Sequence, residues 1–80
     1  MPYVDKILRE KIDSGNYEPI EAGELNYKIT KIVLGYLGNE PHYKEFNDVL
    51  GVLTAIQHEL YRRRIADYEN DAIKRNSDVY

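Results

Sequence analysis

The segment from Pro41 to Asn76 constrains the fold more than any other part of the sequence. No further proline interrupts it, and it contains a single glycine, Gly51. Its apolar residues recur every three or four positions, which is the period of an α-helix. These residues are Tyr43, Phe46, Val49, Leu50, Leu53, Ile56, Leu60, Ile65, Tyr68, Ala72 and Ile73. The spacing predicts one long helix over residues 41–75, which would span roughly 54 Å if unbroken.

Two shorter helices are predicted before the long one, over residues 3–14 and 24–37. Gly15 follows the first helix, where a left-handed C-cap would close it, and Gly38 ends the second. The connector between the helices contains Ile20, which we expect to anchor it to the core. The apolar positions of the first helix are Val4, Ile7, Leu8 and Ile12. Those of the second are Leu25, Ile29, Ile32, Val33, Tyr36 and Leu37.

The expected fold is all-α, with one domain over residues 1–80. A chain of 80 residues has no room for two domains, and its small core is marginal without a disulfide. The long helix is longer than the other two can cover. Either it bends near Arg64–Asp67, or its far half packs on another subunit. We therefore expect a helical hairpin or bundle that is completed by oligomerisation, as a homodimer or a higher homo-oligomer.

Charge and hydropathy exclude several classes of protein. A net charge of −3 argues against general nucleic-acid binding, because such proteins are usually basic. The longest unbroken apolar run is Ile32–Leu34, which is too short to cross a membrane. The N-terminus lacks the apolar core of a signal peptide, so the expected location is the cytoplasm. No nucleophile lies beside a plausible base and no phosphate-binding loop occurs, so we expect no enzyme and no cofactor.

The metal-binding patterns in the sequence are incomplete. His42 and His58 lie too far apart in the sequence for one site. Asp67, Glu69 and Asp71 have the spacing that opens a calcium loop, but alanine occupies the position where the turn needs glycine. We therefore expect no bound metal.

The basic run Arg62–Arg64 on the long helix is the most specific candidate for a binding site. Arg62 and Arg63 could bind a phosphate, and Tyr61 and Tyr68 flank them at helical distance and could stack on a base. The competing interpretation is that nearby acids such as Glu59 neutralise the arginines along the helix. A third interpretation is that the chain's C-terminus, at Tyr80, folds back onto them.

Two further groups of residues are candidates. Glu24, Asn26 and Tyr27 lie at the start of the second helix, where free backbone N–H groups can bind an anion, although these residues fit a helix cap at least as well. Gly51 and Ala55 form a shallow strip beside the apolar face, which suits a close helix–helix contact at an interface. Otherwise Gly51 is a tolerated surface glycine.

Several of these segments together resemble a small uncharacterised family of tailed-phage proteins. The segments are Gly23–Tyr27 with Ile29 and Thr30, Phe46–Gly51, Glu59–Arg63, Tyr68 with Glu69, and the ending Asp78–Tyr80. The resemblance covers nearly the whole chain. The family's tail reads Asn-Gly-Asp-Val-Tyr, and this sequence departs from it with Ser77 in place of the glycine. The resemblance implies a phage or prophage setting and the host cytosol, and it implies no particular activity.

Two hypotheses about function follow. In the first, the chain is a non-catalytic phage protein that binds a host or phage protein through a tyrosine-rich helical surface. In the second, it is an oligomeric sponge that binds a phosphorylated small molecule or signalling nucleotide between subunits, through Arg62, Arg63, Tyr61 and Tyr68. A structural role in the virion leaves no specific mark in the sequence.

Overall fold

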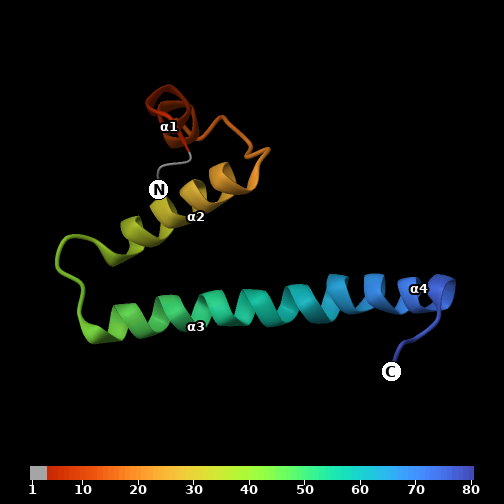
Figure 1. Ribbon diagram of the computed structural model, residues 1–80. Coiled ribbons are helices and arrows are strands. Elements are labelled where there is room, and N and C mark those ends of the chain that lie inside the picture. Colours follow the sequence, from red (N-terminus) through yellow and green to blue (C-terminus); the bar gives the residue numbers. More distant parts are fainter. Residues whose placement is uncertain (1–3) are drawn as a thin grey trace. The chain divides into compact units, whose positions relative to one another are not determined.

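The computed structural model describes residues 4–80, and residue 3, where the first predicted helix starts, lies outside this range. In the described part of the chain all regular structure is helical and there is no strand (Figure 1). The elements are α1 (Lys6–Asp13), α2 (Ala22–Leu37), α3 (Tyr43–Leu60), a five-residue π-helical segment (Tyr61–Ile65, called the π-turn below) and α4 (Ala66–Asn76). The predicted all-α class is confirmed, with two shorter helices and a long final one.

The chain divides into two compact units, which are described separately. Unit 1 comprises Met1–Glu45 and unit 2 comprises Phe46–Tyr80. Unit 1 contains α1 and α2, which contact each other (Figure 1). Unit 2 contains most of α3, the π-turn and α4.

Local hydrogen bonds fix the ends of α1. The carboxylate of Asp5 accepts a hydrogen bond from the backbone N–H of Leu8 at 2.8 Å, which makes Asp5 a side-chain N-cap. Gly15 follows the helix with φ +83°, and its N–H donates to the carbonyl of Ile12 at 3.1 Å. The left-handed glycine predicted at this position is confirmed.

The core of unit 1 is small. Val4, Ile12 and Tyr27 are buried, and Leu8 and Tyr17 pack against them. Ile7 is 69% exposed, because α1 has only eight residues and directs a single narrow face toward α2. The prediction that Ile20 anchors the connector to the core is wrong. The side chain of Ile20 is 82% exposed. The connector is attached instead through the backbone N–H of Ile20, which donates a hydrogen bond to the carboxylate of Glu24.

Gly38 ends α2, as predicted. It has φ +70°, a conformation that side chains with a Cβ rarely adopt, and its N–H donates to the carbonyl of Leu34 at 3.0 Å. The next helix starts at Tyr43, two residues later than predicted. The N–H of His42 donates to the carboxylate of Glu45 at 3.4 Å, and the N–H of Glu45 donates to the carbonyl of His42 at 3.1 Å. This reciprocal pairing caps the helix at His42.

The long helix runs from Tyr43 to Asn76 without a break. Leu60 and Ala66, which flank the π-turn, both have right-handed helical backbone angles. Within the turn the N–H of Ala66 donates to the carbonyl of Tyr61, five residues earlier instead of four. The sequence left open whether the helix bends near Arg64–Asp67, and the structure has the π-turn at this place.

The π-turn explains a shift in the apolar pattern. A turn closed over five residues adds one residue to the helix, which rotates the following side chains by about 100° relative to a regular helix. Ile65 therefore lies in line with Leu60, five positions before it, and Tyr68 continues the line. Without the π-turn the apolar residues of α4 would lie on a different face from those of α3. No helix in residues 4–80 has both the length and the apolar character needed to cross a membrane.

Candidate protein-binding surface on the long helix

Unit 2 exposes its apolar side chains. No residue between Phe46 and Tyr80 is buried, and every residue from Leu50 to Ile65 is exposed. The exposed large apolar side chains on the long helix are Tyr43, Phe46, Leu50, Val52, Leu53, Ile56, Leu60, Tyr61, Ile65, Tyr68 and Ile73. Soluble proteins rarely expose a contiguous apolar surface of this kind unless another molecule covers it. The long helix is therefore the main candidate for a binding surface.

Two of the three tyrosines on this helix, Tyr61 and Tyr68, lie in or just after the π-turn. We call Leu60, Tyr61, Ile65 and Tyr68 the π-turn surface. Leu60, Tyr61 and Ile65 are 52%, 51% and 39% exposed, and Tyr68 is 69% exposed. An open hollow of about 320 Å³ lies here, lined by Gln57, His58, Leu60, Tyr61 and Ile65. Three of the five residues that line this hollow, Leu60, Tyr61 and Ile65, belong to the π-turn surface.

Glu59 pairs with both candidate arginines. Its Oε2 lies 3.0 Å from Nη2 of Arg62 and 2.8 Å from Nε of Arg63. These three side chains are exposed, so the pairs contribute little to stability. Their effect is to orient the two guanidinium groups toward Glu59 and to offset part of their charge. The structure thus shows the pairing along the helix that the sequence predicted as one interpretation of the arginine run.

The C-terminal tail is not docked on the arginines. Tyr80 is fully exposed, and its backbone N–H donates to the carboxylate of Asp78 at 2.9 Å. Ser77 ends α4 with φ +67°, in the region that favours glycine.

Glu24, Asn26 and Tyr27 all have local structural roles in unit 1. The buried carboxylate of Glu24 accepts a hydrogen bond from the N–H of Ile20 at 3.2 Å. Asn26 accepts one from the hydroxyl of Thr30 at 3.0 Å. The hydroxyl of Tyr27 donates to both carboxylate oxygens of Asp13, 3.0 Å from each. Only the contact of Glu24 lies at the start of α2, where its carboxylate holds a backbone N–H of the connector, and the N-cap residue Glu21 makes no side-chain cap hydrogen bond.

Two tyrosines of unit 1 have raised pKa values. Burial is the main cause for Tyr27, and the hydrogen bond to Asp13 and the negative charge of Asp13 raise its pKa further. For Tyr17 the main cause is a hydrogen bond between its hydroxyl and Glu24, followed by burial and by the charges of Glu24 and Glu21. In both cases the neutral phenol donates to a carboxylate, and this interaction is lost when the phenol ionises.

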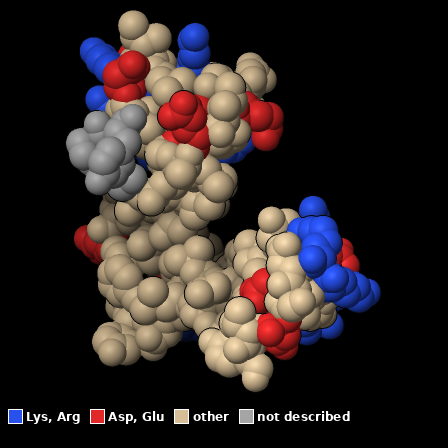
Figure 2. All heavy atoms as spheres, turned by 45° about the vertical axis from the view of Figure 1, so that its right-hand side comes forward, with Lys and Arg blue, Asp and Glu red and all other residues tan. Residues whose placement is uncertain are grey.

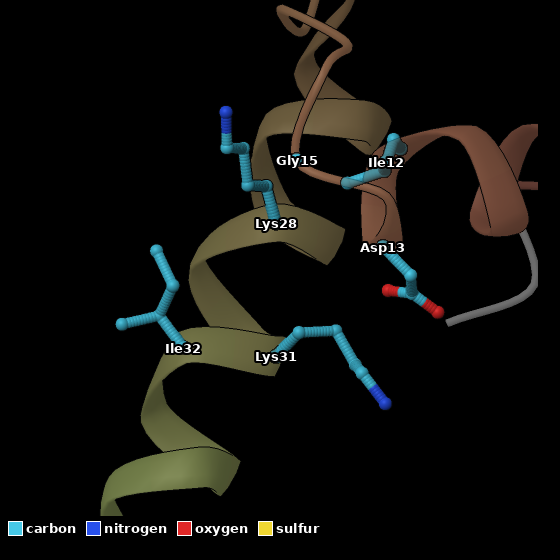
Figure 3. Close-up of a pocket in the computed structure, with 6 residues that line it drawn as sticks. All are labelled: Ile12, Asp13, Gly15, Lys28, Lys31 and Ile32. Carbon is cyan, nitrogen blue, oxygen red and sulfur yellow. The ribbon is translucent and has the colours of Figure 1, made fainter.

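A shallow groove between α1 and α2 does not form a site for an anion (Figure 3). It is lined by Ile12, Asp13, Gly15, Lys28, Lys31 and Ile32. In Figure 3 the two lysines extend in different directions, so their ammonium groups do not converge on one ligand. Lys28 is also engaged, since its Nζ donates to the carbonyl of Tyr17 at 3.4 Å and lies 3.6 Å from the carboxylate of Glu18.

Gly51 and Ala55 lie on the outside of α3. Both are exposed, and a Cβ added at Gly51 would meet nothing within 4 Å. At about 100° per residue, Gly51 and Ala55 are roughly opposite Leu53 and Leu60 on the helix. Any contact made by the two small residues would therefore use a separate face. Among residues 4–80 there is no group of three or more histidine or acidic side chains arranged to hold a metal ion.

The fold and this surface define a small all-helical protein with an exposed, amphipathic long helix. The chain belongs to a family described as a domain of unknown function, DUF6899, whose model matches residues 1–79. The comparison with curated proteins found no match, and the comparison with solved structures found none either.

Proposed function

We propose that the chain is a non-catalytic binding protein of phage origin that acts in the host cytosol and contacts a host or phage protein through the π-turn surface. The observation that carries this proposal is the exposure of Leu60, Ile65 and Tyr68 along one line of the helix, with the exposed Tyr61 beside Leu60, on a helix that is not covered within its own unit. The phage setting rests on the motif resemblance alone.

The chemistry of the π-turn surface suits a protein partner. Exposed tyrosines combine an apolar ring with a polar hydroxyl, and tyrosine and arginine are the residues that most often dominate binding energy at protein interfaces. Arg62 and Arg63 are already held by Glu59, so less side-chain freedom is lost when a partner binds. An acidic group on the partner would compete with Glu59 for the same guanidinium groups.

The alternative ligand, a phosphorylated small molecule, stays a prediction. It requires Arg62 and Arg63 to face a phosphate, whereas one carboxylate lies within 3.0 Å of both in this structure. A thermal-shift assay with nucleotides checks it. A rise in the unfolding temperature that disappears in the variant with Arg62→Ala and Arg63→Ala would favour the nucleotide over a protein partner.

Affinity capture from phage-infected cells tests the proposed function. The tagged protein is compared with the variant carrying Tyr61→Ala and Tyr68→Ala, and Tyr43→Ala serves as the matched control. Tyr43 is 81% exposed on the same helix but lies outside the π-turn surface. We expect the double variant to lose a specific partner at least tenfold and the control to retain it. Equal capture by all three proteins would contradict the proposal.

A deletion tests whether the π-turn itself matters. Removing Arg64 shortens the turn by one residue, which restores a regular helix while keeping Leu60 and Ile65 in line. We expect the deletion to close the hollow and weaken capture about tenfold with the helix content unchanged. Arg64→Ala keeps the length of the turn and should retain the partner.

A further inference from the structure

We draw no further inference here: the strongest candidate, the exposed apolar face of α3 around Val49–His58, a segment without charged side chains that precedes the charged groups gathered over the C-terminal part of the long helix in Figure 2, carries nothing because nothing in the structure shows what covers it.

Discussion

At the scale of single residues, unit 1 depends on very few buried side chains. Ile12 is 4% exposed and lies between Val4 and Tyr27 in the small core. Few neighbours are available to fill a cavity at this position, because only Leu8 and Tyr17 pack against these three residues. Ile12 should therefore be the most sensitive aliphatic position in α1.

Truncation of Ile12 should unfold much of unit 1. We expect Ile12→Ala to lower the free energy of unfolding by about 2–4 kcal/mol, from lost burial and from the cavity that remains. Ile7→Ala removes the same atoms from an exposed position of the same helix and should change it by less than about 0.5 kcal/mol. Denaturant unfolding followed by tyrosine fluorescence measures both. Similar losses in the two variants would contradict the core described here.

Because of the two hydrogen-bonded tyrosines, unit 1 should lose stability at alkaline pH. The pKa values of Tyr17 and Tyr27 are raised above 10.0 in the folded chain. A raised folded-state pKa gives a stabilisation that is complete below 10.0 and is lost as the pH rises through the folded pKa. We expect the unfolding temperature of unit 1 to fall above pH 10.0. A tyrosinate absorbance titration should show two of the eight tyrosines ionising late.

Variants that lack the two hydroxyls provide the control for this pH dependence. Tyr17→Phe with Tyr27→Phe should remove the late phase of the titration and much of the alkaline loss of stability. If the variant and the natural chain lose stability in parallel above pH 10.0, the two hydrogen bonds are not its cause.

Periodicity identified two of the three core residues of unit 1 and missed Tyr27. The apolar stripe expected on the second helix is exposed at Leu25, Ile29 and Ile32. Val4 and Ile12 follow from helical spacing, because burial of one face is what creates that spacing. The burial of Glu24 could not be read from the sequence. It depends on the backbone N–H of Ile20 and the hydroxyl of Tyr17 reaching the same carboxylate, and these contacts exist only once the connector has folded.

At the scale of elements, a substitution at Gly51 tests whether another helix packs against the outer face of α3. We expect Gly51→Ala to stabilise the helix by about 0.5–1 kcal/mol, because alanine favours helix and the space around Gly51 is open. Gly35→Ala, also in a helix with open space, is the matched control and should give a similar gain. Thermal unfolding followed by circular dichroism measures both. A loss at Gly51 alone would show that another helix approaches closely there.

The long helix could be predicted from the sequence, but its π-turn could not. The lack of proline and the regular apolar spacing define a helix over residues 41–75, and the structure has it from Tyr43 to Asn76. The signal for the π-turn was the five-residue step from Leu60 to Ile65, which a regular helix does not keep on one face. A step of this size is also compatible with a bend. The choice between them depends on how the backbone satisfies its hydrogen bonds around Tyr61.

At the scale of the whole molecule, the two units have different sources of stability. Unit 1 has its own core, whereas residues 46–80 bury no side chain. An isolated helix in water is only marginally stable, so we expect the long helix to owe its stability to a second chain in the predicted homo-oligomer. The stability of a self-associating element depends on protein concentration, and the stability of an element with its own core does not.

Dilution should therefore lower the stability of the long helix and leave the stability of unit 1 unchanged. We expect amide hydrogen exchange in Tyr43–Leu60 to become faster as the protein is diluted, because each tenfold fall in concentration favours the dissociated chain by about 1.4 kcal/mol per mole of dimer. Exchange in α1 and the adjoining part of α2 should not change with concentration. Leu53→Glu should give the fast exchange of α3 at every concentration, since it places a carboxylate on the apolar face of the long helix and leaves unit 1 unchanged. Protection of α3 that stays constant on dilution would mean that the helix is stabilised within its own chain.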